Sequence, residues 1–367
     1  MSATLRARAD ITDALLGGAG ALDAEIHLGP GDCTLRLRSN SDDLIAGLRD
    51  YFGHVIVEPR QPDMDVIAVE RDAPDLGIEF VDWKREPGKT GRKDSYLDLP
   101  GARLVRKVRT GMVFLQSENQ RIAAGPCIKY DNQVINFINS QYMNWLQNRG
   151  WLICHASGLV KDGRCLAIAG LSGGGKSTLM LRLLGDASVS HLTNDRLFVL
   201  NNGETEAVGI PKLPRINPGT IVHNEALHGL MSAEEREEFL SMPADELWHV
   251  EDKYDVHVDR VYGKGRIVER APLASFLVLN WSRESEEKPS VEMVDLRQRR
   301  DLLSAIMKSP GPFYQFADGR FFEDTMAVDE ETYLTALDGV RIYEATGGVD
   351  FDRLCRQCVD GLMGRDG

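Results

Sequence analysis

The chain has 367 residues, of which 43% are hydrophobic and 27% charged, and its formal net charge is −13. These proportions are typical of a globular protein large enough for one or two cores. The acidic balance excludes broad affinity for nucleic acid or for an anionic membrane. The sequence contains no run of 18 apolar residues and no apolar leader, and its six cysteines are scattered. We therefore expect a cytoplasmic protein without a membrane span.

Residues 1–125 are expected to form a small α/β domain. Its role is unknown, because this part of the sequence shows no catalytic spacing. An amphipathic segment lies at Ile11–Leu16, and Cys33–Arg38 alternates like a half-buried strand. Ser41 can cap a helix over Asp42–Phe52, which has one apolar face. Further short strands are expected at Val55–Val57, Val66–Val69, Ile78–Val81, Ala102–Val108 and Met112–Gln116.

Residues 126–367 are expected to form a second domain that binds a nucleotide. A helix is predicted over Asn132–Gly150, with Asp131 as its cap. Two strands follow at Trp151–Val160 and Arg164–Ala169, and the Asp-Gly pair between them indicates a hairpin. The second strand leads directly into a glycine-rich loop.

The stretch Gly170–Thr178 reads GLSGGGKST and satisfies the phosphate-loop pattern. A helical segment, Leu179–Leu184, follows it. Glycines let backbone N–H groups converge on a phosphate, and the helix N-terminus adds partial positive charge. Lys176 would reach the terminal phosphates, and the Ser177 hydroxyl would bind Mg²⁺. The predicted nucleotide-binding residues are Gly170, Ser172, Gly173, Gly174, Gly175, Lys176, Ser177 and Thr178.

Two further residues lie at positions suited to the chemistry of a phosphate site. Asp195 follows Lys176 by nineteen residues, at the end of a short strand candidate. A carboxylate there can bind Mg²⁺ or orient an attacking hydroxyl. His155 lies on the first strand of the hairpin, fifteen residues before Gly170.

His155, the hairpin, the glycine loop and the Asn194–Arg196 triplet together resemble the catalytic domain of the HPr kinase/phosphorylase family. The similarity covers about residues 128–285 and is greatest to the HPr-kinase-related kinase B group. It implies an α/β fold with a P-loop core and a mixed sheet, as in ATP-using phosphoenolpyruvate carboxykinases. It also implies an ATP- and Mg²⁺-dependent kinase, a protein Ser/Thr as acceptor, and a homo-oligomer.

The chain departs from this family at two positions. Asn194 occupies the place of the acidic residue thought to act as the family's base, and Thr178 replaces the usual Glu. Both changes remove negative charge near the metal and the phosphates. Since an amide takes no proton at neutral pH, the role of base falls to Asp195 or is lost.

Two cations, Lys212 and Arg215, lie in the proline-rich segment Gly209–Gly219. Prolines restrict the backbone, so this segment can present both cations to the charge of a transferred phosphoryl group. A structural crossover with surface cations is the alternative interpretation.

The remaining segments add one metal-ligand candidate. Val256–Tyr262 alternates like a strand. Its Asp259 corresponds to an acidic residue of the family's signature strand, which implies a role in binding Mg²⁺; a surface ion pair with Arg260 is the alternative. Cys355 and Cys358 have no second pair with which to complete a zinc site. Other elements are expected at Leu273–Leu279, Leu296–Met307, Glu331–Leu337, Val340–Tyr343 and Phe351–Met363.

Two functions follow from these observations. The first is a kinase that transfers the γ-phosphate of ATP to a hydroxyl of a protein or a small molecule. Its candidate catalytic residues are His155, Lys176, Asp195, Lys212 and Arg215, and its candidate metal ligands are Ser177, Asp195 and Asp259. The second is a regulatory or scaffold protein that binds ATP without transfer, as Asn194 suggests.

Overall fold

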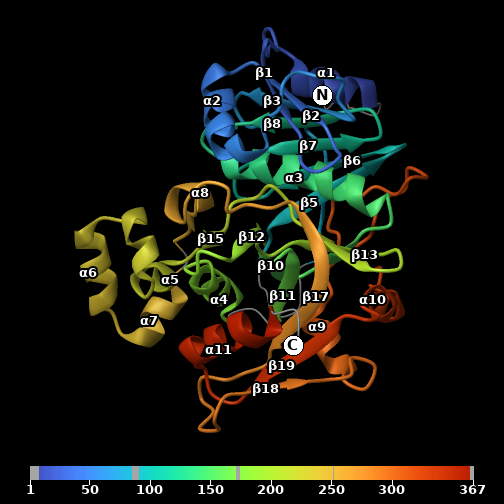
Figure 1. The fold of residues 1–367 in the computed structure, drawn as a ribbon. Helices are drawn as coiled ribbons and strands as arrows, with labels where there is room; N and C mark the ends of the chain where they lie inside the picture. The colour runs from blue at the N-terminus through green and yellow to red at the C-terminus, as the bar shows by residue number, and fades with distance from the viewer. Residues whose placement is uncertain (1–7, 85–90, 171–173, 251, 364–367) are drawn as a thin grey trace. The chain divides into compact units, whose positions relative to one another are not determined.

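The computed structural model of the protein describes residues 8–84, 91–170, 174–250 and 252–363. It is a mixed α/β structure with two compact units (Figure 1). The first unit contains Met1–Arg149 and Ser309–Ala327, and the second contains Gly150–Lys308 and Val328–Gly367. The predicted division between residues 125 and 126 lies inside the first unit. Every helix in the described ranges is too short or too polar to cross a membrane.

The first unit is built on an eight-stranded sheet in the order β1-β2-β3-β8-β7-β6-β5-β4. The pairs β2/β3 and β3/β8 are parallel, and the others are antiparallel. The strands are β1 (Ala24–Leu28), β2 (Leu35–Ser39), β3 (Met64–Glu70), β4 (Val81–Asp82), β5 (Asp94–Leu99), β6 (Ala102–Lys107), β7 (Val113–Ser117) and β8 (Arg121–Gly125).

The helices of the first unit are α1 (Arg8–Leu16), α2 (Asp42–Tyr51), the 3₁₀ helix η1 (Gly53–Val55) and α3 (Asp131–Gln147). The predicted cap of α2 is confirmed, because the Ser41 side chain accepts a hydrogen bond from the backbone N–H of Leu44. The predicted cap of α3 is wrong: Asp131 is in the first turn, and the cap residue is Tyr130. The predicted strand at Val55–Val57 is also wrong, since η1 occupies its start.

The second unit is built on a nine-stranded mixed sheet. Its main path runs β12-β10-β11-β17-β14-β13-β9, with β19 on β17 and β18 on β19. The strands are β9 (Leu152–Cys154), β10 (Ala156–Lys161), β11 (Arg164–Gly170), β12 (Ser190–Thr193), β13 (Leu197–Asn201), β14 (Thr205–Val208), β17 (Arg270–Leu279), β18 (Ser290–Met293) and β19 (Arg341–Thr346). A separate two-stranded ladder pairs β15 (Arg215–Ile216) with β16 (Tyr254–Asp255).

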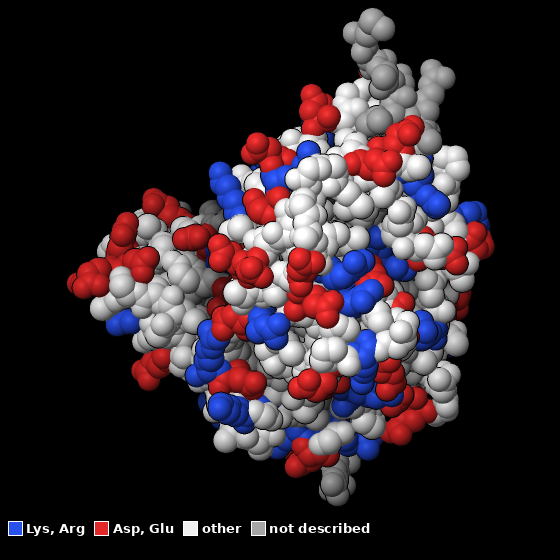
Figure 2. All heavy atoms as spheres, turned by 90° about the horizontal axis from the view of Figure 1, so that it is seen from above, with Lys and Arg blue, Asp and Glu red and all other residues white. Residues whose placement is uncertain are grey.

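The helices of the second unit are α4 (Lys176–Leu183), α5 (Pro218–Val222), η2 (Glu225–Leu230), α6 (Ala233–Ser241), α7 (Ala244–His249), α8 (Val258–Val261), η3 (Arg300–Leu302), α9 (Leu303–Ile306), α10 (Glu330–Ala336), α11 (Phe351–Gln357) and the π-helical turn η4 (Cys358–Leu362). The predicted strand Val256–Tyr262 is therefore wrong, because its centre is the short helix α8. Helix α6 buries no residue, as its acidic sequence predicts. Figure 2 shows acidic side chains concentrated on the lobe that contains α6.

The central strands of the second unit are covered on both faces. On β11, Ala167 belongs to one apolar cluster and Ile168 to the other; on β17, Phe276 and Leu277 divide in the same way. Helices α9 and α10 contribute to the first cluster, and α4 and α11 to the second. Burial on both faces explains why these parallel neighbours read as continuous apolar runs in the sequence.

The hairpin of β10 and β11 confirms the prediction from the Asp-Gly pair. Asp162 and Gly163 both have positive φ, 50° and 75°, as a tight two-residue hairpin turn requires. The predicted first strand is, however, two strands. At His155 the chain leaves β9, which pairs with β13, and enters β10, which pairs with β11 and β12.

Candidate nucleotide-binding site

One edge of this sheet gathers residues from four places in the chain. Because β11 and β12 both run antiparallel to β10, the ends of β11 and β12 lie beside the start of β10. His155 immediately precedes β10, Gly170 ends β11, and Asn194 and Asp195 follow β12. The parallel strand β17 ends at the same edge, where Leu279 pairs with Gly170.

The glycine loop approaches its surroundings too closely for side chains. Gly175 is the cap of α4 at φ 86°, and an added Cβ would lie 2.7 Å from the ring of Phe351. A Cβ on Gly170 would lie 3.0 Å from Cβ of Leu279. The strand, loop and helix around the motif are confirmed by β11 and α4. The predicted ligands Ser172 and Gly173 lie outside the described residues.

The polar side chains at the start of α4 are each held by a neighbour. Lys176 donates from Nζ to the carbonyl of Gly170 at 2.7 Å, so its ammonium group lies at the end of β11. Burial lowers the pKa of Lys176; Asp195 opposes this effect and Lys308 adds to it. Thr178 Oγ1 lies 3.0 Å from Oγ1 of Thr220 on α5.

Asn194 connects the loop helix to the hairpin. Its Oδ1 accepts hydrogen bonds from Ser177 Oγ at 3.1 Å and from Ser157 Oγ at 3.0 Å. The Asn194 side chain is buried. This amide therefore positions the hydroxyl that the phosphate-loop pattern assigns to Mg²⁺.

Asp195 is held by two partners in a strained backbone conformation. Its Oδ1 lies 2.9 Å from Nε2 of His155, and its Oδ2 lies 3.4 Å from Nε of Arg196. Its φ is 70°; apart from the turn residue Asp162, it is the one non-glycine residue with positive φ in the described ranges. Such strain persists where the surroundings enforce it, which is common at functional sites.

The charge state of Asp195 follows from its neighbours. Burial alone would raise its pKa, but the hydrogen bond from His155 and the charges of Arg196 and Lys308 lower it well below the usual range. The Asp195 side chain is nevertheless 43% exposed. It is therefore an ionised carboxylate that a ligand can reach.

The proline-rich segment that contains Lys212 begins beside the end of β12, where the backbone N–H of Ile210 donates to Oγ1 of Thr193 at 3.4 Å. Burial lowers the pKa of Lys212 to about 8, and the charge of Arg196 adds to this effect, while Asp195 opposes it. Arg215 is engaged differently, because its Nε lies 3.2 Å from Oδ1 of Asp255 on the adjacent strand.

Lys308 belongs to the site although its sequence context shows no sign of it. Its charge acts on both Lys176 and Asp195. An isolated bridge between Cys154 and Met307 brings this segment to the sheet edge. The hydroxyl of Tyr333 accepts the Lys308 backbone N–H at 3.2 Å.

Two aromatic residues support the loop and were also missed by the sequence analysis. The indole of Trp281 donates to the carbonyl of Gly174 at 2.9 Å. Trp281 meets Phe351 edge to face, with ring centroids 5.1 Å apart. Trp281 lies two residues after the end of β17, so the parallel pairing of β17 with β11 could have suggested this contact.

The structure gives no support to the predicted metal ligand Asp259. Asp259 was assigned through a strand that is helix α8, and no described residues form a cluster of three or more acidic, His or Cys side chains around a metal position. Burial raises the pKa of Cys355 to about 11, and Cys358 is fully buried. Cys358 is therefore a core residue, and the half-buried Cys355 is a protonated thiol at neutral pH.

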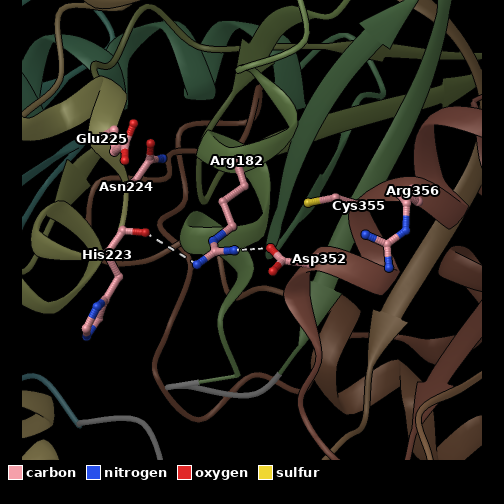
Figure 3. A pocket seen from close by; sticks show the side chains of 7 residues that line it. All are labelled: Arg182, His223, Asn224, Glu225, Asp352, Cys355 and Arg356. Atoms are coloured by element: carbon pink, nitrogen blue, oxygen red, sulfur yellow. Dashed lines mark hydrogen bonds and ion pairs between the residues drawn. The ribbon is translucent and has the colours of Figure 1, made fainter.

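A cavity of about 410 Å³ lies beside α4, apart from the predicted phosphate site (Figure 3). Arg182 on α4 donates to Asp352 at 2.5 Å and to the carbonyl of His223 at 3.3 Å. The full lining is Arg182, His223, Asn224, Glu225, Asp352, Cys355 and Arg356. The Arg182 guanidinium in this cavity is thus already paired with the carboxylate of Asp352.

No family model and no curated protein matches the chain. Among solved structures, the chain is similar to the Hpr(Ser) kinase/phosphatase from Coxiella burnetii, with 11% identity and a TM-score of 0.28. The similarity covers 57% of this chain and 93% of that chain. A similarity of this size establishes neither a family nor an activity.

Proposed function

We propose that the chain is an ATP- and Mg²⁺-dependent phosphotransferase that acts on a hydroxyl acceptor. The observation that supports it best is the His155–Asp195 pair, at 2.9 Å, on the same sheet edge as the glycine loop. A phosphate-binding loop and an accessible carboxylate at one edge are the two parts that transfer to a hydroxyl needs.

The loop residues present fit a triphosphate. Positive φ at Gly175 and the close approach of Phe351 favour glycine at this position. No side chain then covers the backbone N–H groups that a phosphate would contact. Lys176 can exchange its bond to the Gly170 carbonyl for phosphate oxygens. Ser177 would hold Mg²⁺, which would neutralise charge on the phosphates, and Asp195 would either bind the same ion or orient the acceptor hydroxyl.

The residues around Asp195 suit transfer to a hydroxyl. The ionised carboxylate would orient the acceptor hydroxyl and receive its proton as the new P–O bond forms. His155 would hold the carboxylate in place. Lys308, whose charge acts on both Lys176 and Asp195, would stabilise charge on the transferred phosphoryl group.

The resemblance in the sequence extends this proposal. It supports a relative of the HPr-kinase-related kinases that acts as a homo-oligomer. The acidic composition supports a cytoplasmic protein without nucleic acid or membrane partners. The first unit would then have an accessory role, and the second unit would carry the kinase activity.

The test is transfer of labelled γ-phosphate from Mg·ATP to a cell lysate. Wild type, Lys176→Ala and Asp195→Asn would run in parallel, with ATP binding measured separately. The proposal expects label on a discrete protein or metabolite with wild type alone, and retained ATP binding in Asp195→Asn. Label that persists in Asp195→Asn would show that phosphoryl transfer does not require this carboxylate.

A second candidate is an ATP-binding regulatory protein without transfer. The observation that favours it is Asn194, an amide in contact with Ser177 where the resembled family has an acid. Tight Mg·ATP binding by wild type, with neither hydrolysis nor label on any acceptor, would support this second function. Restored transfer in Asn194→Asp would show that the amide is what prevents catalysis.

A further inference from the structure

We propose that the cavity beside α4 binds the nucleoside of ATP, while the glycine loop binds the phosphates. This inference rests on the proposed function and specifies a second part of the same nucleotide site. The cavity lies between α4, the His223–Glu225 segment and α11, with the Arg182 side chain between the other two walls (Figure 3). All of these elements belong to the second unit.

The first argument is the direction in which ATP must extend from the loop. Ser177 faces the end of β12, because its hydroxyl donates to Asn194. Thr178 faces α5 instead, where its hydroxyl meets that of Thr220. Transfer to a hydroxyl at Asp195 requires the γ-phosphate on the Ser177 side of α4. The other end of ATP is therefore expected on the side of Thr178.

The cavity opens on this same side of α4. Arg182 lies four residues after Thr178, about 6 Å along the helix axis, so the two side chains project from one face. Their contacts agree with this: Thr178 meets Thr220, and Arg182 donates to the carbonyl of His223 at 3.3 Å, three residues further along. A nucleoside is bonded directly to the α-phosphate, so a site one helical turn from the loop is within its reach.

Phe351 connects the loop to the cavity. A Cβ on Gly175 would lie 2.7 Å from the Phe351 ring, and the guanidinium carbon of Arg182 lies 5.4 Å from the centre of that ring. Phe351 is also the first residue of α11, which supplies Asp352 and Cys355 to the lining. The loop and the cavity therefore share one wall.

The charge of the lining favours a neutral polar ligand. It contains two cations, Arg182 and Arg356, and two carboxylates, Glu225 and Asp352, so the formal charges cancel when His223 is counted as neutral. A multiply charged anion gains little from such a balance. A nucleoside is the neutral part of ATP, and its hydroxyls and ring nitrogens can bond to donors and acceptors of both kinds.

The shape of the cavity also suits a nucleoside. Asp352 and the His223 carbonyl hold the Arg182 guanidinium in place, and a fixed planar guanidinium offers a face on which a base can stack. The Glu225 carboxylate can accept ribose hydroxyls, as acidic residues do in dinucleotide sites. The volume of about 410 Å³ falls within the range of about 300–1,000 Å³ that is usual for small-molecule sites.

Cys355 provides a test that needs no change to the lining. It lines the cavity and is half-buried, whereas the other five cysteines are buried. Alkylation by N-ethylmaleimide at pH 8.5, followed by mass spectrometry, therefore reports access to the cavity, and Cys355→Ser confirms the assignment. Saturating Mg·ATP should slow this alkylation about tenfold or more, because thiol reactivity depends on access.

Mg·tripolyphosphate is the matched control ligand, since it carries the three phosphates without the nucleoside. It should bind the loop and leave the alkylation rate of Cys355 close to that of the unliganded chain. Protection by both ligands, or by neither although both bind, would overturn the inference and leave the phosphotransferase intact. Failure of wild type to bind either ligand would overturn the proposed function as well.

Two variants then test the cavity through affinity. Glu225→Gln should raise the Kd for Mg·ATP about tenfold, the usual loss for a hydrogen bond to a charged group, and leave the Kd for Mg·tripolyphosphate unchanged. Cys355→Trp, which fills part of the cavity, should show the same selectivity, with thermal unfolding as the check on its fold. Arg353→Gln, an exposed arginine of α11 outside the lining, should match wild type with both ligands. Unchanged Mg·ATP affinity in both cavity variants would overturn the inference.

Discussion

Nε2 of His155 lies 2.9 Å from Oδ1 of Asp195, because β10 begins beside the point where β12 ends. The pair forms only if the hairpin and β12 adopt this register. A carboxylate that must orient a hydroxyl gains precision from such a partner.

We expect Asp195→Asn to lower the rate of phosphoryl transfer about 10²- to 10⁴-fold, the usual range for loss of a proton acceptor. His155→Gln should have a smaller effect, since its amide can still donate to the carboxylate. Initial rates at saturating Mg·ATP would measure both. A larger loss from His155→Gln than from Asp195→Asn would make the imidazole the principal group.

Lys176→Met should weaken Mg·ATP binding about 10- to 100-fold, because it removes a charge-assisted contact to phosphate. Isothermal titration with a non-hydrolysable ATP analogue would measure this loss. Thermal unfolding of the unliganded variant is the control, and its midpoint should match or exceed that of wild type, since desolvation of the lysine lowers its pKa. Unchanged affinity would argue against phosphate binding at this loop.

The Lys212 ammonium should destabilise the unliganded fold at neutral pH. Its pKa is lowered by burial and by Arg196 to about 8, below its usual value of about 10.5, so the unfolded chain binds the proton more tightly. Between these two pH values unfolding takes up a proton, and stability therefore rises with pH.

Lys212→Met removes this effect, so the variant should be more stable than wild type at pH 7, and the gain should shrink towards pH 10. Urea unfolding at pH 7, 8.5 and 10 would measure the difference. A variant that is less stable than wild type at pH 7 would contradict the expected cost of the buried charge. Greater stability combined with lost activity would mark a residue kept for function.

Gly175→Ala should destabilise the second unit and weaken ATP binding. The positive φ costs an L-residue about 1–3 kcal/mol, and the added methyl group would meet the ring of Phe351 at 2.7 Å. Adding Phe351→Leu should recover the steric part and leave the backbone part. Denaturant midpoints of both variants would test this, and full recovery in the double variant would mean that φ has no cost here.

Local signals in the sequence predicted the elements that local interactions determine. Ser41 caps α2, and the Asp162–Gly163 turn joins β10 to β11, because a cap and a tight turn depend on a few adjacent residues. The loop between β11 and α4 was identified in the same way.

Features that depend on distant contacts were not predicted. Val256–Tyr262 alternates like a strand, yet Val258 and Val261 also lie one helical turn apart, and packing selects the helix α8. Lys308 reaches the site through the bridge between Cys154 and Met307, which no spacing in the sequence indicates.

The parallel pairing of β11 with β17 has a consequence for the order in which the site forms during synthesis. The stretch from His155 to Arg196 holds the hairpin, the loop and the carboxylate, and it leaves the ribosome before residues 270–279. Its strand β11 is buried on both faces, however, and gains its second neighbour, β17, only when residues 270–279 are available. Trp281 and Lys308 follow later still. We therefore expect nascent chains that end before residue 308 to bind ATP poorly. Binding of the nucleotide would then stabilise only chains that extend beyond this residue.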